Sequence, residues 1–192
     1  MKQYQSAIEE YLKRETEILS KLDVNAINDA MNAIELAYER RARIYIFGNG
    51  GSASTASHFT NDFNKGVSQV SKRKFEFVCL NDNIATLMAI ANDLSYSQVF
   101  DEQLRGRLNL GDLVIGISGS GNSANVVRAI EYSKEFGVTT IGITGYDGGK
   151  VAALCDISLH VPIHDMQITE DVHLIFNHLM MSIFYNTLGE KR

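Results

Sequence analysis

Leu113-Val114-Ile115-Gly116-Ile117-Ser118-Gly119-Ser120-Gly121-Asn122-Ser123 is an apolar run that passes directly into a turn of serines and glycines. A helical pattern follows over residues 124–135. Strand, glycine-rich turn and helix in this order hold phosphates in α/β proteins, because the turn presents backbone N–H groups and the helix start adds a partial positive charge. The three serine hydroxyls add further donors. The stretch therefore predicts a phosphate-binding turn, in preference to simple turn and capping chemistry at Ser118, Ser120 and Ser123.

Short apolar runs and helical patterns alternate through most of the chain, as they do in a parallel sheet covered by helices on both faces. We therefore predict an α/β fold with a five-stranded, doubly wound (Rossmann-like) parallel sheet. The expected strands cover residues 44–47, 75–80, 113–117, 138–143 and 157–161. The first expected core helix runs from the turn at Gly48–Ser52 to about Lys65. The others cover residues 83–91, 96–106, 124–135 and 169–188.

Two amphipathic helices, over residues 2–21 and 24–40, precede this core. Asn25 is the expected cap of the second helix. They lie outside the strand–helix repeat, so we expect them to cover the core or to pair subunits. The chain of 192 residues has no linker-like segment. We predict one domain, 1–192, made of a helical segment 1–40 and an α/β core 41–192.

Composition excludes several classes of protein. The formal net charge is -5, and the Lys and Arg residues are dispersed along the sequence, so we expect no nucleic-acid partner. Neither a signal peptide nor an apolar run of membrane-spanning length is visible, so we expect no membrane partner and a cytoplasmic location. Cys79 and Cys155 lie in apolar runs and are expected to be buried, reduced thiols.

A second glycine-rich turn, Gly48-Asn49-Gly50-Gly51-Ser52, follows the first expected strand. Gly48-x-Gly50-x-x-Ala53 matches the dinucleotide fingerprint, but the acidic residue expected about twenty positions later is not well placed. Two alternatives stay open beside a phosphate site: dinucleotide binding, and glycines that only form a tight turn. Neither a Walker loop nor a Gly-x-Ser-x-Gly nucleophile elbow is found.

Histidines and carboxylates gather on two expected helices. His58 and Asp62 are four residues apart and share one helix face. Glu170, His173 and His178 lie within about two turns of the last helix. Two imidazoles and two carboxylates would suit a divalent metal such as zinc. The same groups also suit a metal-free acid/base pair, or are surface and core residues without a chemical role.

Four segments together resemble the sugar-isomerase (SIS) domain proteins, and among them the phosphoheptose isomerases most. These segments are Gly48–Ser52, Ala91-Asn92-Asp93, Gly111-Asp112 with Ile117–Ser123, and Thr144–Gly149. The resemblance covers nearly the whole chain. It implies a doubly wound sheet, a homotetramer with active sites between subunits, and aldose–ketose isomerisation of a seven-carbon sugar phosphate for surface glycans.

The resemblance also assigns site residues. The serines of both turns would hold the phosphate; the implied substrate-binding set is Asn49, Gly50, Gly51, Ser52, Asn92, Asp93, Ser118, Gly119, Ser120 and Ser123. The implied zinc ligands are His58, Asp62, Glu170 and His178. The helix carboxylate Asp62 and the imidazole of His178 would act as base and acid.

Two positions depart from the family pattern. Asp62 stands where the family has Glu, and Glu170 stands where the family has Gln. Shortening a base by about 1.5 Å is costly where geometry must hold to within an ångström, so Asp62 would serve as a ligand and Glu170 would take over proton transfer. The more anionic site favours a divalent cation.

The hypothesis from the sequence is an isomerase in which Asp62 or Glu170 moves a proton through an enediol(ate) and His178 acts as acid. The alternatives are a non-catalytic SIS protein that senses a sugar phosphate or binds a partner, and an isomerase for another sugar phosphate. His58 and His178 favour an enzyme.

Overall fold

The computed structural model describes residues 2–189, and within them five strands form one parallel sheet. The strands are β1 (Ile44–Gly48), β2 (Phe77–Cys79), β3 (Leu113–Ser118), β4 (Thr139–Thr144) and β5 (Ile157–His160). Their order is β2-β1-β3-β4-β5, and all neighbours are parallel. The chain runs outward from β1 to one edge and then from β3 to the other. The sheet is therefore doubly wound, which confirms the fold class predicted from the sequence.

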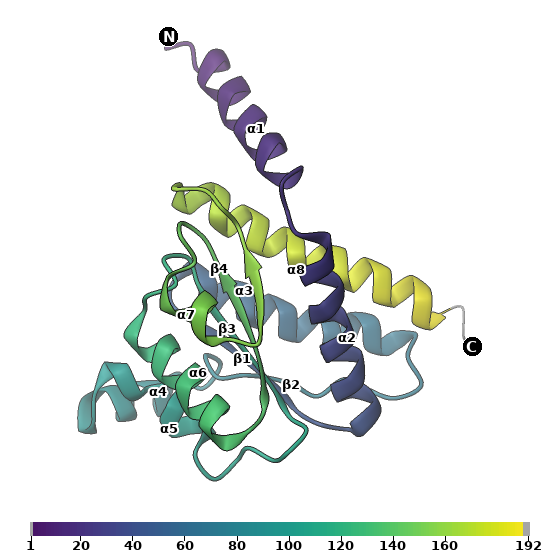
Figure 1. Cartoon of the computed structure of the whole chain (residues 1–192), viewed down its shortest axis with the longest axis vertical. Coiled ribbons are helices and arrows are strands. Elements are labelled where there is room, and N and C mark those ends of the chain that lie inside the picture. Colours follow the sequence, from purple (N-terminus) through teal and green to yellow (C-terminus); the bar gives the residue numbers. More distant parts are fainter. Residues whose placement is uncertain (1, 190–192) are drawn as a thin grey trace.

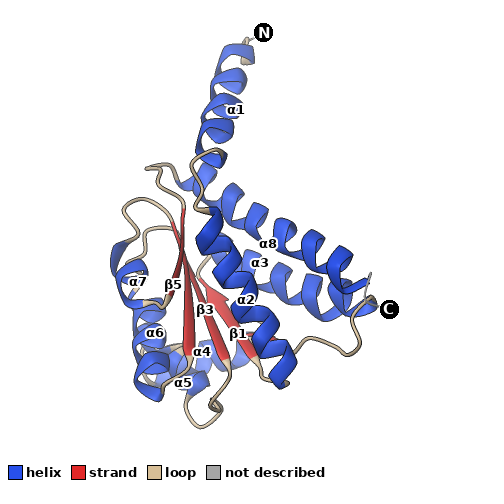
Figure 2. Ribbon diagram, turned by 45° about the vertical axis from the view of Figure 1, so that its right-hand side comes forward, coloured by secondary structure: helices blue, strands red, loops and turns tan. Residues whose placement is uncertain are grey.

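Helices cover both faces of the sheet (Figures 1 and 2). One face carries α2 (Val24–Arg40), α3 (Gly51–Asn61) and α8 (Met166–Gly189), and the other α4 (Ile84–Asp93), α5 (Asp101–Leu104), α6 (Ala124–Phe136) and α7 (Gly149–Leu154). Strand side chains alternate between the two cores, as the pleat requires. In β1, Ile44 and Ile46 pack on the side of α2, whereas Tyr45 and Phe47 pack on the side of α6.

The first helix, α1 (Gln5–Leu19), projects away from the body of the molecule (Figure 1). Its inner half is tied to α8 and the segment before it, because Tyr11 donates a hydrogen bond to Asp171 and Arg14 forms an ion pair of 2.7 Å with Asp165. The Asp171 carboxylate raises the pKa of Tyr11 to about 12, so this phenol stays a donor. The outer half of α1 makes no such contacts among the described residues.

The structure corrects the predictions at the ends of two helices. Asp23, not Asn25, caps α2, and its carboxylate accepts the backbone N–H groups of Asn25 and Ala26. The helix expected to reach about Lys65 is helical to Gly66, but it is α-helical only to Asn61, and its last turn, η1 (Asp62–Gly66), is π-helical. Single π-turns inside helices frequently mark functional sites, because the extra residue re-aims the side chains around it.

The two cysteines are free, and only Cys79 is fully buried. Burial raises the pKa of the Cys79 thiol to about 12, so it remains protonated. Cys155 is half-buried, against the expectation of full burial. Over residues 2–189, the length and hydropathy of the helices fall short of what a membrane span needs.

Candidate active site

The two glycine-rich turns begin side by side at the carboxyl edge of the sheet. Gly48, the last residue of β1, pairs with Ile117 near the end of β3. The chain reverses its winding direction between these two strands, and ligands of doubly wound sheets bind at this position. A reciprocal amide pair joins the turns: Asn49 and Asn125 exchange two Nδ2–Oδ1 hydrogen bonds of 2.9 Å. The sheet therefore brings both predicted phosphate turns together.

The turn after β3 is compact and partly buried. Ser118 donates a hydrogen bond of 3.0 Å to the hydroxyl of Ser123, and the backbone N–H of Asn122 donates to Ser120 Oγ at 3.2 Å. Gly121 has φ +66°, and a Cβ there would lie 1.9 Å from the carbonyl oxygen of Gly148. Only glycine fits at that position. Ser123 precedes α6 without capping it, so its hydroxyl, which accepts from Ser118, can still donate elsewhere.

The turn after β1 opens α3. Gly50 has φ +55°, a conformation suited to glycine, and α3 begins at Gly51. Ser52 is buried in the first turn of this helix, where unpaired N–H groups favour an anion. Asn49 also accepts a hydrogen bond of 2.8 Å from the hydroxyl of Tyr96. The helix expected over residues 96–106 is broken, and Tyr96 lies on its first part, a short 3-10 turn (η3, Tyr96–Gln98) that precedes α5.

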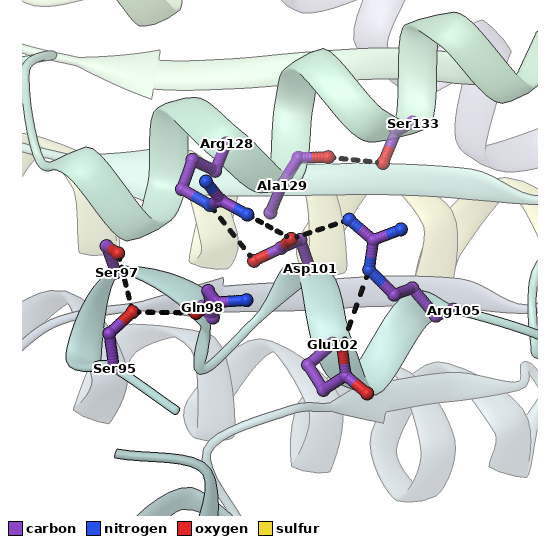
Figure 3. Close-up of polar contacts among 9 residues, drawn as sticks. All are labelled: Ser95, Ser97, Gln98, Asp101, Glu102, Arg105, Arg128, Ala129 and Ser133. Atoms are coloured by element: carbon purple, nitrogen blue, oxygen red, sulfur yellow. Dashed lines mark hydrogen bonds and ion pairs between the residues drawn. The ribbon is translucent and has the colours of Figure 1, made fainter. Parts of the chain in front are cut away.

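The segment that carries Tyr96 is anchored by a buried carboxylate. Asp101 at the start of α5 is 1% exposed, and it accepts from Arg105 at 3.1 Å and from Arg128 of α6 at 3.0 Å (Figure 3). Two charge-assisted bonds to one buried carboxylate hold η3 and α5 against α6. This anchoring keeps the Tyr96 hydroxyl close to the first turn.

Asn92 and Asp93 lie at the end of α4 and are both exposed. A hydrogen bond of 2.7 Å from Asn92 Nδ2 to Asp93 Oδ1 joins them to each other. No hydrogen bond among the described residues joins them to the two turns. Their assignment as substrate-binding residues stays a prediction.

Three of the four predicted metal ligands meet between α3 and α8. Suitable ligand atoms of His58, Asp62 and His178 all lie within 4.8 Å of one another. Asp62 Oδ2 is 3.2 Å from His58 Nε2 and 3.9 Å from His178 Nε2, and the two imidazole nitrogens are 3.3 Å apart. Both histidines are partly exposed, with 41% and 53% of their side chains accessible, whereas only 10% of the Asp62 side chain is. We call these three residues the triad.

The fourth predicted ligand, Glu170, does not join the triad. Its carboxylate lies over the start of α3, where a methyl group on Gly51 would come within 2.5 Å of both carboxylate oxygens. Glu170 is half-buried and makes no hydrogen bond or ion pair with the rest of the described chain. The partial positive charge of the α3 N-terminus favours a carboxylate at this place. Glu170 therefore lies beside the phosphate turns, with its oxygens free.

A polar face of α8 that the sequence analysis did not recognise lies beneath the triad. Thr169, His173 and Asn177 follow one another at intervals of four residues and are fully buried. Burial lowers the pKa of His173 to about 4, so its imidazole is neutral. Asn177 donates a hydrogen bond of 2.7 Å to Asp62 Oδ2. The four-residue spacing of Thr169, His173 and Asn177 along α8 was the available signal.

The donor set of the triad fits a divalent metal. Two imidazole nitrogens and one carboxylate oxygen, gathered within 4.8 Å, are ligands that zinc accepts, and the accessible histidine edges leave one side open. The phosphate turns and the triad stand at opposite ends of the first two turns of α3. Six residues separate Ser52 from His58, which is about 9 Å along a helix axis. The arrangement can bind an anion at one end and polarise or deprotonate a group at the other.

Comparison with known proteins gives one consistent result. The family model for the SIS domain matches residues 3–145. A phosphoheptose isomerase from Aliarcobacter butzleri is 42% identical over 147 residues, 77% of this chain and 77% of that protein. One from Clostridium acetobutylicum is 34% identical over 190 residues, 96% of each. A solved phosphoheptose isomerase from Neisseria gonorrhoeae superposes with a TM-score of 0.87 at 29% identity, covering 95% of this chain and 98% of that one.

Proposed function

This chain belongs to the SIS-domain family, and from that membership we propose that it is an aldose–ketose isomerase of the phosphoheptose isomerase type. It interconverts sedoheptulose 7-phosphate and D-glycero-D-manno-heptose 7-phosphate, a step in the synthesis of heptose for surface glycans. The observation that carries the proposal is that two adjacent phosphate turns open α3 and α6, while the triad of ligands lies further along α3 and against α8.

The phosphate docks at the switch point between β1 and β3. Backbone N–H groups at the starts of α3 and α6 and the hydroxyls of Ser52, Ser118, Ser120 and Ser123 supply the donors. The formal net charge of the chain is -5, so these local donors, and not the overall charge, must attract the phosphate. With the phosphate fixed there, the sugar extends along α3 toward His58, which a seven-carbon chain is long enough to do.

Zinc is the proposed metal, held by His58, Asp62 and His178. When bound, it would supply a Lewis acid that polarises the sugar carbonyl. Glu170 is not needed for this role, because the triad already provides three protein ligands, as catalytic zinc sites do.

Glu170 is the proposed proton carrier. Asp62 Oδ2 is engaged by Asn177 and faces two imidazoles, whereas the carboxylate of Glu170 has no partner and is accessible. In the complex with substrate, the Glu170 side chain would turn from the start of α3 toward the triad, take the proton from C1 of the ketose, which leaves an enediol(ate), and return it to C2. Nδ1 of His178, the ring nitrogen that does not face Asp62 and His58, gives a proton to O2 and takes one from O1, so that the carbonyl moves from C2 to C1 with atoms balanced.

The protein is proposed to act as a cytoplasmic homotetramer whose active sites lie between subunits. Apolar side chains that are more than half exposed support an assembly: Tyr4, Ile8 and Leu12 form one face of the projecting α1, and Ile84 and Met88 one face of α4. Light scattering of the purified protein tests the subunit number.

One experiment tests the function directly. The purified protein is incubated with sedoheptulose 7-phosphate, with and without a chelator, and the aldose is measured by nuclear magnetic resonance. Aldose formation that the chelator abolishes and Zn²⁺ restores is the expected result. Binding of the sugar phosphate without any aldose would favour the alternative of a sensor protein.

A further inference from the structure

The carboxylate of Asp62 is held from behind by an amide on the other helix. Asn177 Nδ2 lies 2.7 Å from Asp62 Oδ2, and the Asn177 side chain is completely buried. The second amide near this carboxylate, Asn61 Nδ2, is 3.3 Å from Oδ1 and belongs to an exposed residue, so it restrains Asp62 little. Asn177 therefore makes the one short buried bond to this group among the described residues.

The oxygen that Asn177 contacts is the one that faces the histidines. Asp62 Oδ2 is also the atom 3.2 Å from His58 Nε2 and 3.9 Å from His178 Nε2. A carboxylate oxygen has two lone pairs. With one of them directed at Asn177, the other is directed into the space between the two imidazoles. The amide thus fixes which oxygen, and which lone pair, the triad presents.

Asp62 needs such a restraint because of its place in the chain. It is the first residue of the π-turn, where the regular helix geometry changes. Its terminal carboxylate torsion is broad and roughly two-fold, so packing alone leaves the oxygens free to rotate. A hydrogen bond from a buried, immobile donor removes that freedom.

We propose that Asn177 is a positioning residue that orients Asp62 Oδ2 for metal binding between His58 and His178; this inference rests on the proposed function. Ligating carboxylates are commonly fixed by such outer hydrogen bonds, and loss of one typically costs about 10–100-fold in metal affinity or activity.

The polar face around Asn177 supports a functional reason for this residue. Asn177 Oδ1, both ring nitrogens of His173 and the hydroxyl of Thr169 are buried with no hydrogen-bond partner in the described structure. Burying such a group without a partner lowers the stability of the fold. The neighbouring buried positions of α8, Phe176 and Met180, are apolar. A residue that served only packing at position 177 would be apolar too.

The test compares Asn177→Ala and Asn177→Leu with the parent protein, each stripped of metal and titrated with Zn²⁺ against a chromogenic chelator. We expect the dissociation constant for Zn²⁺ to rise about 10–100-fold in both variants, and kcat to fall with little change in KM. Absorption of the Co²⁺-substituted proteins gives a second readout, because an altered ligand geometry changes the visible spectrum.

Gln103→Met is the matched control. Gln103 is a buried amide that donates to the carbonyls of Leu80 and Val99, and it lies on the opposite face of the sheet. This variant should lose thermal stability and keep the parent's affinity for Zn²⁺.

Two outcomes would overturn the inference. If the Asn177 variants bind Zn²⁺ and turn over as the parent does, Asn177 positions nothing. If Gln103→Met, at a similar loss of stability, loses Zn²⁺ affinity as much as the Asn177 variants do, the loss reflects unfolding and the role of Asn177 is structural. A parent protein that neither binds Zn²⁺ nor forms aldose would refute the proposed function itself, which is a distinguishable result.

Discussion

The phosphate turns and the helix pair that carries the triad are built in different ways. Backbone atoms hold the turns: the N–H of Gly145 donates to the carbonyl of Gly119 at 2.8 Å, and that of Val151 to Gly121 at 2.9 Å. The triad consists of side chains, which come from α3, from the π-turn that follows it and from α8. α3 and α8 are more than a hundred residues apart in the chain.

The two regions should therefore respond differently to single substitutions. A site made of backbone N–H groups depends on glycine at a few positions and shares the ligand among many donors, so one side chain contributes little. A site made of side chains depends on each of them, because every one has its own role and geometry. We expect single substitutions to affect the chemical step at the triad end more than binding at the turns.

The largest expected effect is that of Glu170→Gln. If Glu170 moves the proton, its amide cannot, and kcat should fall by about 10²–10⁴ with the Zn²⁺ affinity retained. Exchange of the C1 proton with deuterated solvent, followed by nuclear magnetic resonance, should slow in parallel. Unchanged exchange would mean that Asp62 is the base, so that the triad alone would carry the chemical step.

The next effect concerns stability and the buried His173. Its pKa is lowered to about 4, below the ordinary value of 6.5. Between these values the unfolded chain binds a proton that the folded chain does not, so the free energy of unfolding falls as the pH falls from 6.5 to 4. The loss amounts to about 3 kcal/mol at the acid end and is absent above pH 6.5.

Urea denaturation at several pH values measures this loss. His173→Leu should remove this part of the pH dependence, since leucine does not titrate. Identical pH dependence of the free energy of unfolding in the two proteins would show that His173 does not destabilise the folded state at low pH.

Gly51→Ala tests whether Glu170 acts from its position over the start of α3, because Gly51 contacts Glu170. A methyl group there would lie 2.5 Å from the carboxylate oxygens and would push them aside. Displacing a reacting group by about an ångström costs on the order of 10²-fold in kcat. Alanine favours the helix, so thermal stability should not fall. Parent-like kcat would mean that Glu170 acts from another position.

Ser120→Ala should give the smallest effect. The exposed hydroxyl of Ser120 is one of several donors at its turn. Losing one hydrogen bond to a charged group costs about 1.5 kcal/mol, which is roughly tenfold in KM, and kcat should stay unchanged. Steady-state kinetics measure both. A large fall in kcat would contradict the view that the turns only bind.

The sequence predicted the parts that short motifs specify. The doubly wound sheet follows from apolar runs of strand length, and the two turns follow from glycines at Gly50 and Gly121, whose positive φ values the structure confirms. Four metal ligands were predicted residue by residue from helix spacing and family resemblance, and three of them, the triad, meet.

What the sequence did not predict depends on the contact between α3 and α8. The π-turn at Asp62 and the hydrogen bond from Asn177 arise only when the two helices pack, since neither leaves a local pattern. The separation of Glu170 from the triad has the same origin. Its position eight residues before His178 places it two helical turns away, opposite the beginning of α3 rather than its end.

The position of α8 in the chain has a consequence for biosynthesis. All five strands and both glycine-rich turns precede α8, so the ribosome completes them first. His58 and Asp62 are therefore synthesised well before His178 and Asn177, their partners on α8. The proposed anion site can therefore form during synthesis before the proposed metal site, which is complete only when α8 docks.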